Sequence, residues 1–314
     1  MASYRVVADG PLDETVLGFA GADIEFLPWP RDGGRSPTRV DGIYTYGHPR
    51  VDGAMLDRLP GARVISNYGV GVDHIDVANA CQRNIPVGNT PGILEGTTAD
   101  TGFALLLAAA RRVVEGDRYA RSPQFSRYDP GHMLGREVHS STLGIIGLGN
   151  IGGQVAQRAR GFNMRVLYHN RRRRAAAEAQ FGAEYASFAG LLALADHVML
   201  TCPLTVSTNR MIDAAALRKM KRTATLVNIA RGPVVDTQAL YEALRERRIA
   251  AAGLDVTDPE PLPRDHPLLA LDNVTILPHL GSATVETRRK MAEISIQNLM
   301  LGLRGQQLLH AVAP

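Results

Sequence analysis

Short apolar runs alternate with stretches of helical periodicity along nearly the whole chain. The first series of runs occupies residues 5–8, 24–27, 42–44, 64–66 and 85–88. The second series occupies residues 143–146, 166–168, 197–201, 225–229, 251–254 and 274–277. Strands that alternate with helices are typical of βαβ units and parallel sheets. We therefore predict an α/β fold with two doubly wound parallel-sheet domains, the second with a sheet of six strands.

Two longer helical patterns flank the second series. Residues 98–120 are expected to form one long helix, apolar enough in its first half to be buried on more than one face. The segment from Thr284 to Leu303 has the pattern of an amphipathic helix that returns to the first domain. We therefore expect residues 1–98 and 282–314 to form one domain, with residues 99–281 inserted in it as the other.

A glycine-rich turn opens the second series. The strand at 143–146 is followed by Gly-Leu-Gly-Asn-Ile-Gly and then by a helical pattern. In a dinucleotide site, Gly147 would allow the tight turn, Gly149 the approach of a pyrophosphate, and Gly152 the packing of helix on strand. The first helical residues, Asn150 and Ile151, would face the phosphates with the positive helix end. This order predicts a Rossmann domain; a purely structural turn is the alternative.

The residues after the second strand of this domain indicate which dinucleotide is bound. The position that contacts the ribose lies about 20 residues after the glycine motif and is acidic when the cofactor is NAD. Here it is Asn170, followed by Arg171, Arg172, Arg173 and Arg174. Guanidinium groups bind a 2′-phosphate, which a carboxylate would repel. We predict NADP, with NADPH preferred over NADH; the alternative is a solvated basic run that opens the next helix.

Composition and charge exclude several classes of protein. The chain has 314 residues, of which 45% are hydrophobic and 21% charged, an ordinary composition for about two globular domains. The net charge of +4 is scattered apart from the arginine run, and no nucleic-acid recognition motif accompanies it. No nucleic-acid partner is therefore expected.

Cysteine usage and the apolar runs bear on metal, redox state and location. Cys81 and Cys202 are far apart and form no paired motif, so neither a disulfide framework nor a metal site is predicted. The first residues lack a signal-peptide pattern, and the longest apolar run, 103–110, is too short to span a membrane. These features favour a cytoplasmic protein without a membrane partner.

Three polar residues follow strands of the second series and form a candidate catalytic set. They are Arg231, Glu260 and His279. Hydride transfer to a 2-keto acid requires a fixed cation for the carboxylate and carbonyl, and a general acid for the developing alkoxide. Arginine and histidine suit these roles, and a carboxylate would fix the tautomer of the histidine and keep it protonated. Each residue alone is better explained as part of an ordinary turn or solvated loop, whereas the three together favour the catalytic set.

Long ordered motifs give the chain a family resemblance. They occupy residues 67–76, 89–92, 147–152, 228–233, 253–256 and 277–282. In these motifs the chain resembles the D-isomer-specific 2-hydroxyacid dehydrogenases, most closely their glyoxylate/hydroxypyruvate reductase branch. The resemblance implies a flavodoxin-like substrate domain around the Rossmann domain. It also implies that Arg231 binds the keto acid, that His279 donates the proton, and that Glu260 is the partner of His279.

The same resemblance implies further contacts. The backbone amides of Val70 and Gly71 would hold the substrate carboxylate, and Ser282 would lie beside the substrate. Asp255 would accept a hydrogen bond from the nicotinamide carboxamide. Two pairs would line the cofactor cleft, namely Cys202 with Pro203 and Ile229 with Ala230. Cys202 would be a packing residue, because no neighbour in sequence favours a reactive thiolate. A homodimer is implied, with residues 99–140 as its contact.

The leading hypothesis is NADPH-dependent reduction of glyoxylate or hydroxypyruvate to the D-2-hydroxy acid. One departure leaves substrate size open: the branch commonly has a Gly-x-Trp segment before the glycine motif, where this chain has residues 122–128 with Phe125. Phenylalanine keeps the bulk but lacks the indole N–H. A 2-ketogluconate reductase or a broad 2-keto-acid reductase is the alternative, and a dinucleotide-sensing corepressor is a remote one.

Overall fold

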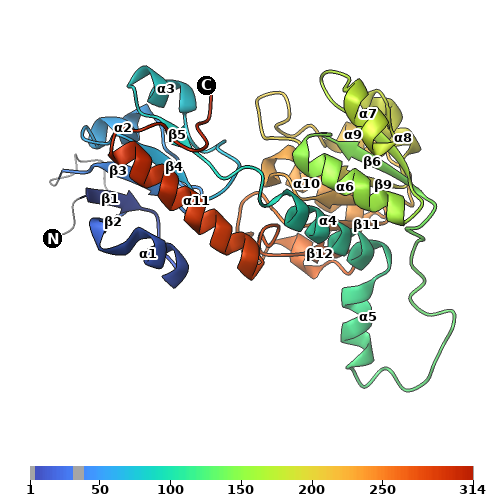
Figure 1. Ribbon diagram of the computed structural model, residues 1–314. Coiled ribbons are helices and arrows are strands. Elements are labelled where there is room, and N and C mark those ends of the chain that lie inside the picture. The colour runs from blue at the N-terminus through green and yellow to red at the C-terminus, as the bar shows by residue number, and fades with distance from the viewer. Residues whose placement is uncertain (1–3, 31–38, 314) are drawn as a thin grey trace. The chain divides into compact units, whose positions relative to one another are not determined.

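The computed structural model describes residues 4–30 and 39–313. Its contacts divide the chain into two compact units, one of residues 1–94 with 284–314 and one of residues 95–283. We call these the outer unit and the inserted unit, because the second lies within the sequence of the first (Figure 1). The division falls within a few residues of the predicted domain boundaries.

The outer unit is built on a five-stranded parallel sheet. The strands are β1 (Tyr4–Ala8), β2 (Ile24–Pro28), β3 (Gly42–Thr45), β4 (Ile65–Asn67) and β5 (Val87–Gly88), in the order β2-β1-β3-β4-β5. The helices are α1 (Glu14–Ala20), α2 (Gly53–Arg58), α3 (Val77–Gln82) and α11 (Val285–Leu303), with a 3-10 turn η1 (Gly21–Asp23). This strand order is that of flavodoxin-like folds, as predicted.

The C-terminal helix α11 joins the outer unit through its buried face. It packs against α1, β3, β4 and β5. Ser295 on this helix bonds the Tyr44 hydroxyl at 2.8 Å, and its carbonyl accepts from the Ser66 hydroxyl at 2.6 Å. These buried hydrogen bonds fix the helix against two neighbouring strands of the outer unit.

The inserted unit carries a larger parallel sheet. Its seven strands are β6 (Thr142–Ile146), β7 (Arg165–His169), β8 (Ala183–Tyr185), β9 (His197–Leu200), β10 (Thr225–Asn228), β11 (Ala251–Leu254) and β12 (Val274–Ile276), in the order β12-β11-β10-β9-β6-β7-β8. The chain order reverses between β6 and β9, which is the switch point of a doubly wound sheet. The predicted six-stranded sheet was wrong by one strand: β8 is a short edge strand in which only Ala183 is buried, so it has no apolar run.

Helices cover both faces of this sheet. The helices of the unit are α4 (Glu95–Ala110), α5 (Val113–Ala120), α6 (Asn150–Gly161), α7 (Ala175–Phe181), α8 (Phe188–Leu194), α9 (Ala214–Lys219) and α10 (Thr237–Arg245), with 3-10 turns η2 (Gly232–Val234) and η3 (Pro267–Ala270), and all of the α-helices except α5 lie against the sheet or its covering helices. Adjacent strand residues point to opposite faces. Ile145 therefore lies in the core with α4 and α6, and Ile146 in the core with α8, α9 and α10.

The predicted single helix at residues 98–120 is two helices. The chain breaks between α4 and α5 at Arg112, which has a left-handed φ of 55° and whose guanidinium bonds Glu115 at 2.6 and 2.7 Å. Helix α4 is largely buried, whereas α5 has no buried residue and extends from the sheet with the loop that follows it (Figure 1). The hydrophobic pattern does not predict this break. The apolar run ends at the point where the chain changes direction, and the end of an apolar run is equally compatible with a helix that continues straight into solvent.

In the part of the chain that the structure describes, every helix is too short or too polar to cross a membrane.

Candidate active site

The glycine turn lies between β6 and α6 in the inserted unit. Gly147 has a φ of +106°, and a Cβ at this position would lie 2.6 Å from the backbone nitrogen of Cys202. A Cβ on Gly152 would overlap the Gly147 carbonyl, so both positions require glycine for packing. Gly149 differs, because a Cβ there would meet no protein atom within 4 Å. The open space beside Gly149 suits the approach of a pyrophosphate to the backbone.

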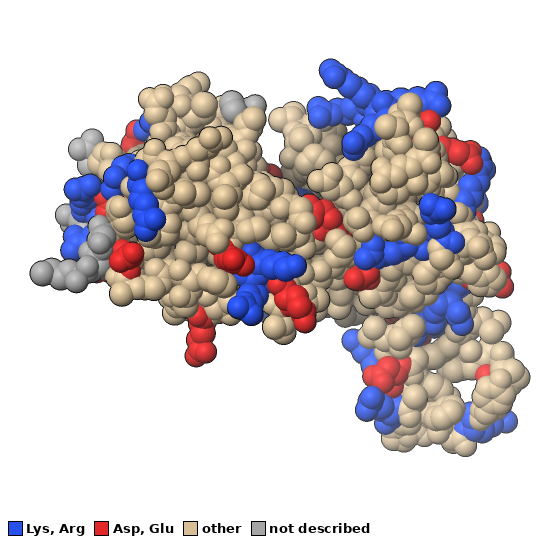
Figure 2. Space-filling model, in the orientation of Figure 1, with Lys and Arg blue, Asp and Glu red and all other residues tan. Residues whose placement is uncertain are grey.

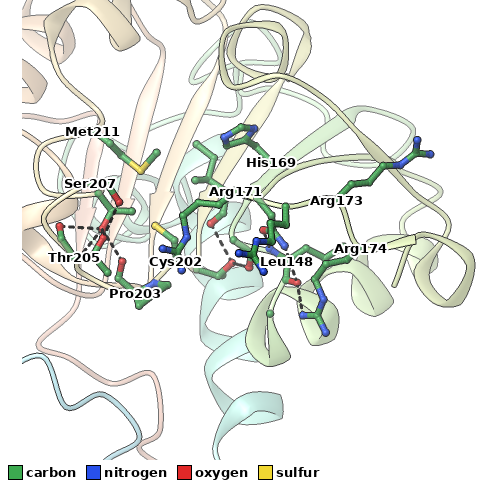
Figure 3. Close-up of a pocket in the computed structure, with 17 residues that line it drawn as sticks. Leu148, His169, Arg171, Arg173, Arg174, Cys202, Pro203, Thr205, Ser207 and Met211 are labelled. Carbon is green, nitrogen blue, oxygen red and sulfur yellow. Dashed lines mark hydrogen bonds between the residues drawn. The ribbon is translucent and has the colours of Figure 1, made fainter. Parts of the chain in front are cut away.

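A cavity of about 1010 Å³ extends from this turn. It is bordered by residues 146–149, 169–174 and 201–203, with Thr205, Ser207, Thr208 and Met211 (Figure 3). Asn150 and Ile151 begin helix α6 at its edge, where the first amides of a helix have no acceptor within the helix. The cavity lies at the carboxyl ends of β6, β7 and β9, where doubly wound sheets bind dinucleotides.

Asn170 fastens the glycine turn to the end of β7. Its side-chain oxygen accepts from the Leu148 amide at 2.7 Å, and its side-chain nitrogen donates to the Leu148 carbonyl at 3.3 Å. Thr201 holds the same turn from β9, since its hydroxyl donates to the Gly147 carbonyl at 2.8 Å. A carboxylate at position 170 would lack the side-chain N–H that donates to the Leu148 carbonyl. The neutral side chain therefore suits the turn, and it also avoids the repulsion between a carboxylate and a phosphate-bearing cofactor.

Basic side chains gather around the cavity. Arg171, Arg172, Arg173 and Arg174 all contribute to its lining and all are exposed. Figure 2 shows Lys and Arg side chains concentrated at the end of the inserted unit that carries α7, the helix that follows this run. This concentration of positive charge favours an anionic ligand.

His279 and Glu260 form a hydrogen-bonded pair. The Nδ1 atom of His279 lies 2.7 Å from Oε1 of Glu260, whose Oε2 accepts from the Thr257 amide at 3.2 Å. Their side chains are 31% and 39% exposed, so the pair is held by the protein yet open to solvent. Because Nδ1 donates to the carboxylate, Nε2 lies on the opposite side of the ring, where a reacting group could meet it.

Asp255 positions the backbone around His279. Its carboxylate accepts from the amides of Leu280 at 2.7 Å and Gly281 at 2.8 Å, and its carbonyl accepts from the His279 amide at 2.9 Å. His279 itself has a left-handed φ of 56°. Burial raises the pKa of Asp255. The expected contact of Asp255 with a nicotinamide stays a prediction, but its carboxylate clearly holds the turn that carries the histidine.

Arg231 follows β10, the strand beside β11. Its guanidinium donates to the Ala230 carbonyl at 2.9 Å. The side chain of Asn228 donates to the Arg231 carbonyl at 2.9 Å and accepts from the Ala230 amide at 3.0 Å. Arg231, Glu260 and His279 thus follow β10, β11 and β12 at one edge of the sheet.

A second loop of interest lies in the outer unit, after β4. The side chain of Asn67 donates to the carbonyls of Gly69 and Gly71, and that of Asn89 donates to the carbonyl of Val70. The amides of Val70 and Gly71 donate to no acceptor within the described residues. This loop therefore presents two backbone donors of the kind that bind a carboxylate.

Comparison with known proteins identifies the family. A model described as D-isomer specific 2-hydroxyacid dehydrogenase, NAD binding domain, matches residues 103–281. The chain belongs to this family. Its inserted unit is therefore the NAD-binding domain of a D-2-hydroxyacid dehydrogenase, and the predicted fold class and family are confirmed.

Individual family members are similar over most of their length. The glyoxylate reductase of Korarchaeum cryptofilum is 51% identical over 257 residues, 82% of this chain and 77% of that protein. The NADPH-dependent glyoxylate/hydroxypyruvate reductase of Sinorhizobium meliloti, solved with NADP and malonate, is 31% identical with a TM-score of 0.90, covering 99% of this chain and 97% of that one. The D-lactate dehydrogenase of Aquifex aeolicus, solved with NAD and lactic acid, is 27% identical with a TM-score of 0.86, covering 99% of each chain. Family membership alone therefore leaves the coenzyme open.

The predicted site residues of this D-2-hydroxyacid dehydrogenase fall in separate places. Cys202 and Pro203 line the cavity with the glycine turn and the arginines, whereas Ile229 and Ala230 are buried at the end of β10 and lie outside the described lining of that cavity. Burial raises the pKa of the Cys202 thiol to about 11, in agreement with a packing residue. Ser282 lies in the turn before α11, and its substrate contact stays a prediction.

Sequence reasoning missed the residues that hold these groups in place. They are Asn67, Asn89, Tyr168, Glu178, Thr201 and Thr257. Asn67 and Asn89 lie in the motifs at 67–76 and 89–92, and Thr201 and Thr257 follow the ends of strands. These positions were the signal in the sequence that could have indicated a supporting role. Their partners are distant in sequence, so only the fold reveals the contacts.

Proposed function

We propose that this dehydrogenase reduces a small 2-keto acid, glyoxylate or hydroxypyruvate, to the D-2-hydroxy acid with NADPH. The observation that carries this proposal is the hydrogen bond between His279 and Glu260 at the sheet edge that also carries Arg231. The glyoxylate reductases among its relatives support the substrate class.

The chemistry divides among the three residues. The reduced nicotinamide, when bound, supplies a hydride to C2 of the keto acid. Arg231 binds the carboxylate and polarises the carbonyl, and the amides of Val70 and Gly71 hold the carboxylate. His279 gives a proton from Nε2 to the carbonyl oxygen as negative charge develops there, and Glu260 stabilises the positive ring.

The coenzyme preference rests on the end of β7. Asn170 stands where an acidic residue would bind the ribose hydroxyls of NAD, and four arginines border the same cavity. The room beside Gly149 and the basic lining both fit a dinucleotide that carries an extra phosphate.

The dimer contact is proposed at α5 and the loop after it. Large apolar side chains are exposed there: Val113 by 53%, Phe125 by 51%, Tyr128 by 83% and Leu134 by 72%. Contact with a second copy would bury them. Light scattering on the purified chain should give the mass of a dimer, and replacing Tyr128 and Leu134 together with serine should shift it toward the monomer.

An initial-rate panel tests the function. Glyoxylate, hydroxypyruvate, pyruvate and 2-ketogluconate are each offered with NADPH and with NADH. We expect glyoxylate or hydroxypyruvate with NADPH to give the highest kcat/KM, by about tenfold over NADH, because a charged hydrogen bond contributes about 1.5 to 3 kcal/mol. A higher kcat/KM with NADH would refute the coenzyme assignment, and a preference for 2-ketogluconate would refute the substrate assignment.

A further inference from the structure

A second cavity of the inserted unit opens at the amino edge of its sheet. It has a volume of about 470 Å³ and shares no lining residue with the cavity beside the glycine turn. Its walls are the end of α4, the side of α5, the residues at which the loop after α5 returns, and the segments around the starts of β10, β11 and β12. A cavity of this size can hold a small molecule.

The break between α4 and α5 creates this cavity. The left-handed φ of 55° at Arg112 turns α5 away from the sheet, and the loop that follows returns at Gly135. A Cβ on Gly135 would lie 2.6 Å from the Ala110 carbonyl, which also accepts from the Arg136 amide at 2.8 Å. The return of the loop is therefore fixed against the end of α4, and α5 with this loop forms one wall of the cavity.

Two of the arginines in the lining are paired with its two acidic residues. Arg112 forms an ion pair with Glu115 at 2.6 Å, and Arg247 forms one with Asp272 at 2.6 Å. Each carboxylate in the described lining is thus neutralised by a neighbouring guanidinium group. The negative charges of the cavity are therefore already matched.

Three further arginines of the lining have no such match. They are Arg118 on α5, Arg136 in the returning loop and Arg222 before β10. All three are exposed, and none of their side chains has a hydrogen bond or ion pair with a residue that the structure describes. Figure 2 shows Lys and Arg side chains on α5 and where this segment meets the rest of the inserted unit. Like charges that converge from distant segments repel one another and raise the local concentration of anions.

The floor of the cavity is polar as well. The hydroxyl of Thr225 and Oδ1 of Asn273 are enclosed without a hydrogen-bond partner in the described residues, and both residues contribute to the lining. Enclosed polar atoms without a partner are uncommon and often indicate a site for water or an ion. A polar floor under unpaired arginines suits a hydrated anion better than apolar side chains from a second copy of the chain.

We propose that this cavity binds a small anion that carries at least two phosphate or carboxylate groups, held by Arg118, Arg136 and Arg222. Guanidinium groups bind both kinds of anion through paired N–H donors, and three of them require more than one negative charge for neutralisation. Arg118 and Arg136 belong to the projecting segment, whereas Arg222 belongs to the body of the unit. The bound anion therefore ties α5 and the loop after it to the sheet.

Calorimetry with pyrophosphate and with citrate tests the site, and the two probes distinguish phosphate from carboxylate. The chain is first saturated with its preferred coenzyme, so that the cavity beside the glycine turn is occupied. We expect R118Q and R222Q each to weaken at least one probe about fivefold, the upper end of what an exposed ion pair contributes. R111Q is the matched control, because Arg111 is exposed and adjoins Arg112 but lies outside the described lining. Equal Kd values for R111Q, R118Q and R222Q with both probes would overturn the proposal.

Nucleotide binding shows whether the effect is confined to this cavity. 2′,5′-ADP and 5′-AMP are the adenosine halves of NADP and NAD, and they report on the cavity beside the glycine turn without catalysis. We expect their Kd values on the coenzyme-free chain to stay within about twofold in R118Q and R222Q, because these residues lie outside that cavity. A parallel loss of nucleotide and anion binding would mean a general effect of charge or folding, and would overturn the separate site.

Hydrogen exchange tests whether the anion joins the two walls. In the unmodified chain and in R111Q, saturating pyrophosphate or citrate, whichever binds more tightly, should slow amide exchange in residues 113–137 by about threefold or more, because a bound ligand suppresses local opening. The same concentration should slow exchange distinctly less in R222Q, which lacks the cation on the body of the unit. If calorimetry shows the anion bound while exchange in residues 113–137 is unchanged, the anion does not hold this segment and the proposed site is wrong.

Discussion

The two ends of one sheet edge are organised differently. At β6 and β7, the cavity is bordered by a contiguous glycine turn and by exposed arginines, two of which, Arg171 and Arg172, have their donors available. At β11 and β12, the proposed catalytic residues Glu260 and His279 come from separate loops, bond each other, and are held by the Thr257 amide and the Asp255 carboxylate. The proposed coenzyme end thus has hydrogen-bond donors available, and the proposed catalytic end is arranged in advance. This difference suits the proposed roles, because a general acid must be held in a fixed geometry.

Removing His279, the proposed proton donor, should have the largest effect on this comparison. H279Q should lower kcat about 10²- to 10⁴-fold, the usual contribution of a general acid. The affinity for 2′,5′-ADP should stay within about twofold, because His279 is not part of the described cavity lining. Near-normal turnover would show that another group supplies the proton. A parallel loss of nucleotide binding would show that the two ends are not independent.

Two glycines at the proposed coenzyme end should respond differently to substitution by alanine. G147A places a Cβ against Cys202 at a left-handed φ, so we expect the free energy of unfolding to fall by about 2 to 5 kcal/mol. G149A meets no protein atom within 4 Å and should lose less than about 1 kcal/mol, yet it should weaken 2′,5′-ADP. Urea titration and calorimetry measure the two effects. Equal destabilisation by both substitutions would contradict the assignment of Gly149 to ligand approach.

The negative charge of Glu260 should contribute to the rate of reduction. E260Q can still accept a hydrogen bond from His279 but carries no negative charge, so a positive ring would lose its stabilising neighbour. We expect kcat at neutral pH to fall about tenfold, while the affinity for 2′,5′-ADP stays within about twofold. A kcat equal to that of the unmodified chain would limit Glu260 to orienting the ring.

The same contrast explains what the sequence could predict. The core strands were evident, because adjacent apolar residues such as Ile145 and Ile146 fill the two opposite faces of the sheet. Strand β8 was not, since Glu184 and Tyr185 are exposed. The break at Arg112 is a left-handed backbone at a residue other than glycine, which periodicity does not encode. Contiguous motifs likewise indicated the coenzyme end directly, while Glu260 and His279 came from chemical reasoning and family resemblance.

The opposite, amino edge of the sheet should govern stability in mild acid. His197 begins β9, is 1% exposed, and places Nε2 3.1 Å from the Glu137 carbonyl, while its buried Nδ1 has no partner within the described residues. Burial therefore lowers the pKa of His197, although Glu137 and Asp196 oppose the shift. In the unfolded chain this histidine takes up a proton near pH 6.5, whereas in the folded chain it resists protonation, so the unfolded state binds more protons as the pH falls.

The free energy of unfolding should accordingly decrease below pH 6.5, by at most about 1.4 kcal/mol per pH unit while His197 stays neutral in the folded state. H197Q removes the titrating group, and its profile between pH 6.5 and 5 should be flatter. Asp196, the neighbour of His197, does not account for a change in stability between pH 6.5 and 5. Burial raises the pKa of Asp196, but Lys221 and the Thr142 amide lower it by more, so the stability that its carboxylate contributes is lost only below its ordinary pKa of 3.8. Urea titrations across this range measure the profile, and equal slopes for both chains would remove His197 as the cause. If H197Q flattens the stability profile without lowering turnover, and E260Q lowers turnover without changing that profile, stability in mild acid and catalysis depend on opposite edges of one sheet.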